Sequence, residues 1–409
     1  MPSNAELLAL AQQHLYPNYR PAPFVLEHGA GCEVWDVEGK RYLDLCAGVA
    51  VCSVGHAHPR YVRALAEQAA TLGHVSNWFY NARNIEAAAR LSRISGMDRV
   101  FFCNSGCEAT EALLKLARHH FFGAGQPRRG RIIAFDDAFH GRTLGALSMT
   151  GTAKYREGFG DLGAVTHVPY GDLGAVQAAL GPDVAGIIVE PVQGEGGVLP
   201  APPRLLSDLR ALCDASGALL LVDEVQTGIG RLGSWFGYQQ AGIRPDAVAV
   251  AKGLGGGFPV GALLTREAFA GALPPGTHGS TFGGNPLGAA AILSVLSIIE
   301  AEDLLSAARE KGARLAAGLQ GIAADFPEVC EGARGQGLLQ GLVLKPEFSA
   351  REVVKRAFEL GYLIIGAGEH VLRFAPPLII SDAQLTEGIA ATRRLIAELR
   401  RWGDAPQRS

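Results

Sequence analysis

The sequence predicts an α/β protein built on a mainly parallel sheet, with a smaller α+β domain near the C-terminus. Two observations support this fold class. In the middle of the chain, short uninterrupted apolar runs alternate with helical patterns, and after about residue 286 this alternation gives way to a long apolar helix. Uninterrupted apolar runs are typical of strands that are buried on both faces of a helix-covered parallel sheet. A chain of 409 residues is long enough for two domains.

The middle of the chain contains the predicted strands. Five apolar runs have strand length, namely residues 99–103 (RVFFC), 131–135 (RIIAF), 184–190 (VAGIIVE), 218–224 (ALLLVDE) and 247–251 (AVAVA). Helical patterns at residues 108–121 and 203–216 separate some of these runs. Strands that alternate with helices indicate a wound α/β sheet.

The two ends of the chain show other patterns. Residues 32–45 (CEVWDVEGKRYLDL) indicate a hairpin that turns at Glu38 and Gly39. One long helix is expected over residues 286–319, followed by a strand–helix–strand–helix order. Ser381 and Gln384 have the S-x-x-Q spacing of a capping box, which indicates that the last helix begins there.

Composition excludes several classes of protein. The net charge is −3 and no basic tract occurs, so nucleic-acid binding is not expected. The N-terminus lacks a signal-peptide pattern, and no apolar run approaches the roughly 18 residues that a membrane span needs, so we expect a cytoplasmic protein. Seven cysteines without a CxxC pair indicate reduced thiols. His56 and His58 precede Pro59 and are interpreted as part of a turn, with no metal site expected.

Lys252 is the first candidate for chemistry. It lies between an apolar run and a glycine cluster in residues 247–262 (AVAVAKGLGGGFPVGA). A Walker loop places its lysine after the glycines, and a dinucleotide loop needs a glycine where Phe258 stands. A lysine at the end of a buried strand is desolvated, and desolvation favours the neutral, nucleophilic amine that reacts with aldehydes. The alternative is a lysine that extends from the sheet edge into water.

Asp223 is the second candidate, because it also ends a predicted strand. Ligands of open α/β sheets bind beyond the carboxyl ends of the strands. A carboxylate there can keep a pyridine nitrogen protonated, although a helix cap or a surface ion pair would explain it equally well. Together, Lys252 and Asp223 meet the needs of a pyridoxal phosphate site, which are an amine for the aldehyde and an acid for the ring nitrogen.

The phosphate of such a cofactor needs free N–H groups. Ser105, Gly106 and Cys107 lie between a predicted strand and a predicted helix, where backbone N–H groups at a helix start bind phosphate. Phe139 offers an aromatic ring for stacking on the cofactor. An ordinary strand–helix turn and a core phenylalanine are the alternative interpretations.

Seven motifs in order carry a family resemblance: NSGCEATEALLKLAR (104–118), AFHGRT (138–143), VEPVQGEGG (189–197), DEVQTGIGR (223–231), AKGLGGGFPVGA (251–262), HGSTFGGNPL (278–287) and LRFAPPLII (372–380). The chain resembles the class III, fold-type I pyridoxal-phosphate-dependent aminotransferases from about residue 17 to 398, and within them the acetylornithine aminotransferase group. The resemblance implies a large domain with a seven-stranded, mainly parallel sheet at residues 56–290 and a small domain at 291–409. It also implies an N-terminal segment, residues 1–55, that packs with the small domain and a dimer partner.

The implied activity is transfer of the δ-amino group of N2-acetyl-L-ornithine to 2-oxoglutarate. The products would be N-acetyl-L-glutamate 5-semialdehyde and L-glutamate, as in arginine biosynthesis. Alternative donors are succinylornithine, ornithine, 4-aminobutyrate and acetyl-lysine, and an aminomutase is a further possibility. A non-catalytic protein that binds a phosphate ligand is an alternative of another class. The resemblance implies a homodimer with shared active sites, small-molecule substrates, and no nucleic-acid or membrane partner.

The resemblance also implies roles for single residues. Lys252 would bind the cofactor aldehyde covalently and then move a proton, while Asp223 would hold the ring nitrogen protonated. Cys107 departs from the family, which commonly has alanine or threonine there, and a backbone contact tolerates the change. The full expected cofactor-binding set is Ser105, Gly106, Cys107 (phosphate), Phe139 and Val225 (ring faces), Gln226 (phenolic oxygen), His140, Glu190, Asp223, Lys252, Ser280 and Thr281, the last from the neighbouring subunit.

Substrate recognition follows from the two carboxylates of 2-oxoglutarate, since arginine forks bind carboxylates well. By resemblance, Arg373 takes the carboxylate next to the reacting carbon and Arg142 takes the distant one. Acetylornithine reacts at its far δ-amine, so its only carboxylate lies on Arg142 and leaves Arg373 unpaired. An unpaired buried charge is costly, and Glu195 is expected to pair with Arg373 at that stage. Residues 50–59 and 75–81 are expected to line the pocket and the dimer seam.

Overall fold

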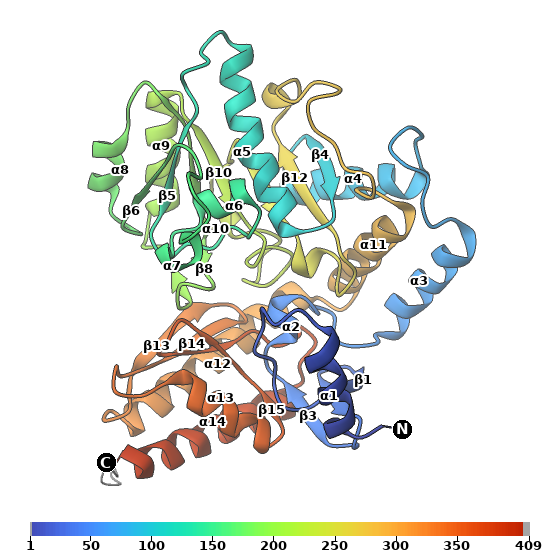
Figure 1. Cartoon of the computed structure of the whole chain (residues 1–409), viewed down its shortest axis with the longest axis vertical. Helices are drawn as coiled ribbons and strands as arrows, with labels where there is room; N and C mark the ends of the chain where they lie inside the picture. Colours follow the sequence, from blue (N-terminus) through green and yellow to red (C-terminus); the bar gives the residue numbers. More distant parts are fainter. Residues whose placement is uncertain (1, 404–409) are drawn as a thin grey trace.

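A seven-stranded sheet forms the centre of the larger half of the molecule (Figure 1). The structure is a computed structural model that describes residues 2–403. Strand β12 runs antiparallel to both of its neighbours, and the other strands are parallel to one another. This confirms the predicted mainly parallel α/β fold. The strand order is β4 (Arg99–Cys103), β12 (Gly261–Thr265), β11 (Ala247–Val250), β10 (Leu219–Asp223), β7 (Val184–Val189), β5 (Arg131–Phe135) and β6 (Val165–Val168).

Both faces of this sheet are covered, which explains its uninterrupted apolar strands. Leu219 and Leu221 of β10 pack in one cluster with helix α5 (Gly106–Gly123), whereas Leu220 and Val222 pack in the cluster of helix α9 (Leu205–Ser216). The second face is also part of the core that includes α11 (Pro286–Ala301), which packs on α3 (Pro59–Thr71) and α4 (Ala82–Ser95). Shorter helices of the larger half are α6 (Leu144–Met149), α7 (Ala153–Arg156), α8 (Leu173–Ala179) and α10 (Gly237–Gln240).

The two chain ends together form the smaller half of the molecule, below the large sheet in Figure 1. The predicted hairpin is present as β2 (Glu33–Asp36) and β3 (Arg41–Asp44), and Gly39 in its turn has φ 81°. Strand β15 (Tyr362–Leu363) joins β3, so the N-terminal segment shares a sheet with the C-terminal part. The remaining N-terminal elements are α1 (Asn4–His14), β1 (Leu26–Ala30) and α2 (Ala47–Ala50).

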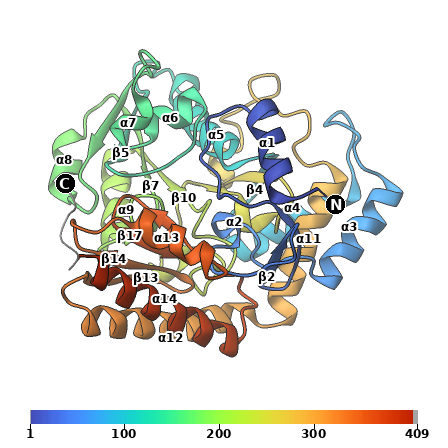
Figure 2. The ribbon, with the colours of Figure 1, turned by 60° about the horizontal axis from the view of Figure 1, so that its bottom comes forward.

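An antiparallel sheet lies in the C-terminal part, with the order β13 (Cys330–Gln336), β14 (Leu339–Leu344), β17 (Val371–Phe374) and β16 (Ile365–Ala367). Helices α12 (Leu304–Asp325) and α14 (Asp382–Gly403) pack side by side, as Figure 2 shows, and α13 (Ala350–Glu359) contacts α14. The predicted capping box is confirmed. Gln384 N–H donates to Ser381 Oγ at 3.2 Å, and Ser381 N–H donates to Gln384 Oε1 at 3.1 Å.

The expectation of one long helix over residues 286–319 is wrong. The chain turns at Glu302 and Asp303, and Asp303 has φ 46°, a left-handed value that aspartate tolerates better than most residues. Helix α11 packs on the large half, whereas α12 packs on β13 and α14 of the smaller half. Apolar residues recur at helical spacing on both sides of the break because each helix packs against its own half, whereas residues 300–303 at the break itself are exposed.

The division into three segments remains a prediction. Residue 290, where we placed the boundary, lies inside α11, and residues 404–409 of the expected small domain lie outside the described residues. Among residues 2–403, none of the helices combines the length and the apolar character that crossing a bilayer requires.

Candidate active site

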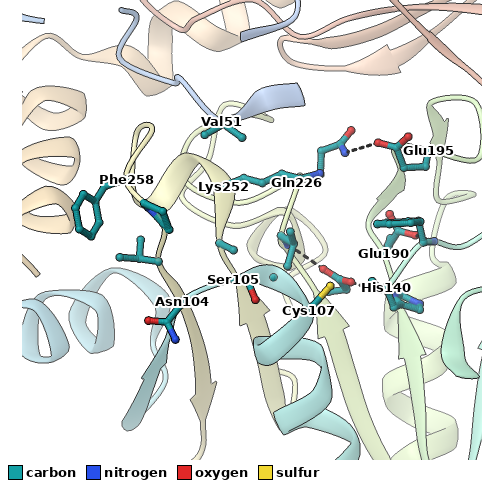
Figure 3. A pocket seen from close by; sticks show the side chains of 18 of the residues that line it. Val51, Asn104, Ser105, Cys107, His140, Glu190, Glu195, Gln226, Lys252 and Phe258 are labelled. Carbon is teal, nitrogen blue, oxygen red and sulfur yellow. Dashed lines mark hydrogen bonds and ion pairs between the residues drawn. The ribbon is translucent and has the colours of Figure 1, made fainter. Parts of the chain in front are cut away.

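A cavity of about 310 Å³ opens at the carboxyl ends of the large sheet (Figure 3). Its walls come from the segments that follow β4, β5, β7, β10 and β11. This is the edge at which open α/β sheets bind ligands. The sequence-predicted residues that line it are Ser105, Gly106, Cys107, Phe139, His140, Glu190, Glu195, Asp223, Val225, Gln226 and Lys252.

Lys252 extends into this cavity directly after β11. It begins a short 3₁₀ turn, Lys252–Leu254, with φ 46°, a strained backbone for a residue with a side chain that costs about 1–3 kcal/mol. Burial lowers the pKa of its amine; the nearby Glu195 carboxylate opposes this shift and Arg373 adds to it. The lowered pKa favours the neutral amine, which is the nucleophilic form.

Asp223 is held at the cavity by two contacts. Its Oδ2 lies 2.7 Å from Nδ1 of His140, and its Oδ1 accepts the Val225 N–H at 2.9 Å. Burial alone would lower the pKa of His140, but the hydrogen bond and charge of Asp223 raise it overall. His140 Nε2 has no hydrogen-bond partner in the part of the chain that the structure describes. The pairing of these two side chains was not foreseen, although His140 was counted among the cofactor-binding residues.

The start of α5 presents free N–H groups to the cavity. Ser105 caps the helix through its Oγ, which accepts the Glu108 N–H at 3.2 Å. Within residues 2–403, the N–H groups of Gly106 and Cys107 donate no hydrogen bond. A Cβ atom at Gly106 would come within 2.8 Å of Val225 Cγ1, so only glycine leaves this approach open. The arrangement fits a phosphate group.

Arg373 is buried at the other side of the cavity with a carboxylate beside it. Its Nη1 donates to Glu195 Oε1 at 2.5 Å and to Gln226 Oε1 at 3.2 Å. Burial would raise the pKa of Glu195, but the charge and hydrogen bond of Arg373 lower it overall. Gly194 permits this packing, because a Cβ atom there would lie 2.0 Å from Gln226 Oε1.

Four expected site residues do not line the cavity, namely Arg142, Ser280, Thr281 and Arg373. Arg373 reaches the site through its contacts with Glu195 and Gln226. Arg142 is exposed near the opening, with its guanidinium 3.9 Å from the centre of the Tyr155 ring. Ser280 accepts a hydrogen bond from Asn104 at 3.1 Å, and Thr281 is exposed on the surface of its own chain.

Glu190 lines the cavity in a supporting position. Its carboxylate accepts the N–H groups of Phe139 at 3.0 Å and of Gly194 at 3.4 Å, which ties two wall segments together. Burial raises the pKa of this carboxyl group. Val51 also lines the cavity, and it belongs to the segment 50–59 that was expected to line the pocket. Phe258 lines the cavity as well but was not expected there, because its side chain has no polar group that would indicate chemistry.

The donor set of the cavity fits pyridoxal phosphate. An amine is present for the aldehyde, a buried carboxylate for the ring nitrogen, Phe139 and Val225 for the ring faces, and free N–H groups for the phosphate. These groups come from the segments after β4, β5, β10 and β11, which meet at one edge of the sheet.

Comparison with known proteins agrees with this fit. The family model described as aminotransferase class-III matches residues 15–396. The acetylornithine aminotransferase of Myxococcus xanthus is 50% identical, covering 94% of this chain and 96% of that protein. The Pseudomonas aeruginosa protein named succinylornithine transaminase/acetylornithine aminotransferase is 43% identical, over 95% and 96%. The crystal structure of the ornithine aminotransferase from Toxoplasma gondii has a TM-score of 0.94 and 33% identity, over 98% and 96%.

Proposed function

Since the chain belongs to the class III aminotransferase family, we propose that it transfers the δ-amino group of N2-acetyl-L-ornithine to 2-oxoglutarate, giving N-acetyl-L-glutamate 5-semialdehyde and L-glutamate. It is a pyridoxal-phosphate-dependent aminotransferase. The proposed reaction is a step in arginine biosynthesis. The name of the Myxococcus xanthus relative, with half of its residues identical, supports this donor.

The ion pair of Arg373 with Glu195 is the observation that best supports an ω-amino donor. In an α-amino donor, a carboxylate is bonded to the reacting carbon. An arginine that is always free to bind this carboxylate is then sufficient. The δ-amine of acetylornithine has no carboxylate next to its carbon, so the arginine must be neutralised from within the protein. Glu195 does this at 2.5 Å, and its glycine neighbours Gly194 and Gly196 leave the backbone free to rotate so that Glu195 moves away when 2-oxoglutarate arrives.

The cofactor supplies an aldehyde that takes up the amino group and a ring that accepts electrons from the bond that breaks at the reacting carbon. Lys252 holds the cofactor and then takes the proton from the substrate carbon that bears the amino group. Asp223, oriented by His140, keeps the ring nitrogen protonated. Gln226 orients the phenolic oxygen, and the N–H groups of Gly106 and Cys107 hold the phosphate.

We assign the distant substrate carboxylate to Arg142. Its guanidinium stacks on Tyr155 and lies 5.4 Å from the centre of the Phe139 ring, which keeps the side chain beside the cavity. Both the α-carboxylate of acetylornithine and the γ-carboxylate of 2-oxoglutarate would reach this position. One arginine therefore serves both half-reactions.

Replacing Arg142 with alanine is expected to raise KM for acetylornithine and for 2-oxoglutarate by about tenfold each, because a charge-assisted hydrogen bond is lost in both complexes. Arg142→Lys keeps the positive charge but loses the planar guanidinium that binds a carboxylate through two hydrogen bonds. It is expected to show a smaller increase in KM. Steady-state kinetics with each substrate varied in turn measures the effect. An increase for one substrate alone would contradict the shared use of this arginine.

Replacing Glu195 with glutamine is expected to slow the acetylornithine half-reaction at least about tenfold, since Arg373 then stays uncompensated while this substrate is bound. The glutamate half-reaction is expected to change far less, because glutamate brings its own α-carboxylate to Arg373. Single-turnover absorbance changes of the cofactor separate the two half-reactions. Equal losses would argue against the switch.

The donor is best tested by single-turnover rates with several amines. Acetylornithine is expected to react fastest among acetylornithine, succinylornithine, ornithine, 4-aminobutyrate and acetyl-lysine. Succinylornithine is the second candidate, because the Pseudomonas aeruginosa relative carries both activities in its name. A faster single-turnover reaction with any other amine would replace the proposed donor. If the amino group is not passed on to 2-oxoglutarate with any of these donors, the proposed function is refuted.

We further propose a cytoplasmic homodimer with shared active sites. Exposed aromatic side chains support an interface: Trp78 is 88% exposed and Tyr80 95% exposed on the single chain, in the segment 75–81. Asn77 of the same segment donates to the carbonyl oxygen of Ser280 at 2.8 Å, next to Thr281. In the dimer, Thr281 would contact the cofactor phosphate of the neighbouring subunit.

A further inference from the structure

A second cavity, of about 610 Å³, lies at the opposite end of helix α5 from the candidate active site. Its lining includes the side chains of the last turns of α5 and of the loop that leads to β5. The charged lining residues are five cations and one carboxylate: Lys115, Arg118, Arg128, Arg129, Arg131 and Asp183. The whole chain carries a net charge of −3, so this is a local concentration of positive charge.

Only one of these cations is neutralised by a carboxylate. Arg131 forms a bidentate pair with Asp183, at 2.7 and 2.8 Å. Among the residues that the structure describes, the other four cations of the cavity have no carboxylate within 4.0 Å. Surface cations of this protein commonly find such a partner, as Arg99 does with Glu267. The cavity therefore keeps a surplus of positive charge.

Arg118 shows that this charge is not simply exposed to water. Its side chain is partly buried, its Nε donates to the Gly130 carbonyl oxygen at 3.0 Å, and its guanidinium lies near Gly163. Burial lowers the pKa of Arg118. An anion in the cavity would compensate a guanidinium that has lost part of its hydration.

Capping of the helix end explains only part of the cluster. Cations near a helix C-terminus are stabilised by the helix dipole, but this effect is confined to the last turn. Lys115 lies two turns before the end, where its Nζ contacts His278 Nδ1 at 2.9 Å and the Thr277 carbonyl oxygen at 3.4 Å. Arg128 lies beyond the helix, on an exposed part of the loop. These side chains converge on the cavity rather than on the carbonyl groups of α5.

An exposed aromatic ring completes the cavity. Phe122 is 63% exposed at the end of α5, and its ring centre lies 5.7 Å from that of His119, another lining residue. A large exposed ring beside a cluster of arginines offers a planar ligand both a stacking face and charge-assisted hydrogen bonds. The cavity also has the volume of small-molecule sites.

From these observations we propose that this cavity binds a nucleoside phosphate, with the phosphates on Arg118, Arg128 and Lys115 and the base against Phe122. The site is separate from that of the cofactor. Helix α5 has 18 residues, or about 27 Å at 1.5 Å per residue, and the N–H groups of Gly106 and Cys107, which we propose hold the cofactor's phosphate, lie at its other end. The proposal does not depend on the identity of the amino donor.

Isothermal titration of the holoenzyme with ADP tests the proposal, with inorganic pyrophosphate as a second probe. We expect one ADP per subunit and weaker binding of pyrophosphate, which lacks the base. Arg128→Glu is expected to weaken ADP binding at least about tenfold, because a cation on the phosphates is replaced by a repelling charge. Phe122→Ala is expected to weaken ADP but not pyrophosphate.

Arg351→Glu is the matched control, since Arg351 is an exposed residue of α13 and its change alters net charge equally. It is expected to bind ADP like the unchanged protein. No ADP binding at about 1 mM, or an equal loss in Arg351→Glu, would overturn the proposal. Equal affinity for pyrophosphate and ADP would overturn the role of the base. Cofactor absorbance and circular dichroism of each variant show separately that the fold and the first site are intact.

Discussion

Replacing Lys252 with alanine is expected to reduce aminotransferase turnover at least about 10³-fold, the upper range for loss of a proton-transferring side chain, and to remove the covalent bond to the cofactor. Lys252 is the one lysine among the described residues that line the cavity. Its position after β11 places the amine in the cavity, and its lowered pKa favours the neutral form that reacts with the aldehyde. Purified protein is expected to be yellow, with a cofactor bond that borohydride reduces, and the variant is expected to lose that bond.

Lys154→Ala provides the control, because Lys154 is exposed and does not line the cavity. It is expected to keep its absorbance and turnover. Mass spectrometry after borohydride treatment locates the cofactor on a single peptide, which should contain Lys252. Turnover of Lys252→Ala within about tenfold of the unchanged enzyme, or a label on another lysine, would refute the assignment.

Replacing Asp223 with asparagine is expected to lower turnover by about 10²–10⁴-fold, since a neutral amide cannot keep the ring nitrogen protonated. The change also removes the charge that raises the pKa of His140. Because a raised pKa favours the imidazolium, this charged form loses its stabilisation in the variant, and His140 is expected to become neutral at a lower pH. The pH profile of turnover and NMR titration of His140 measure the two effects.

Glu224→Gln is a matched control one residue further along the chain. Glu224 is as deeply buried as Asp223, but its carboxylate accepts the Tyr238 N–H at 2.9 Å and the Thr227 hydroxyl at 2.6 Å, outside the cavity. Its replacement is expected to lower Tm while leaving the turnover of folded enzyme nearly unchanged. Similar turnover losses in both variants would indicate that the effect of Asp223 is structural.

Local patterns predicted the main strands well and missed others. Residues 219–222 are apolar at every position because both faces of β10 are covered, and such a run can be recognised without knowing its neighbours. Strands β6 and β12 were not predicted. Residues 165–168 (VTHV) interrupt the apolar run with polar residues, and β12 has a short apolar run that begins at Gly261, directly after the glycine-rich segment. The break at Asp303 was missed because apolar residues recur at helical spacing on both sides of it, although the two helices pack against different halves of the molecule.

The residues of the candidate site could likewise be predicted in part from the sequence. Lys252 and Asp223 could be named from the sequence because each ends an apolar strand, and the strand ends of a parallel sheet meet at one edge. The resemblance of the motifs predicted Arg373 and Glu195 as site residues, and the structure contains the ion pair between them at 2.5 Å. The contact of His140 with Asp223 had no sequence signal, since hydrogen-bond partners of a buried histidine depend on how separate loops pack.

By itself, the sequence determined the α/β class, the covalent lysine candidate and the family motifs, because each of these is written in short contiguous segments. Only the tertiary structure decided which charges meet. His140 lies 83 residues from Asp223, and Glu195 lies 178 residues from Arg373. The basic cavity at the end of α5 likewise joins that helix to segments near residues 163, 183 and 277. Electrostatic contacts act through space over a few ångströms, so their partners emerge only when the sheet has brought distant loops together.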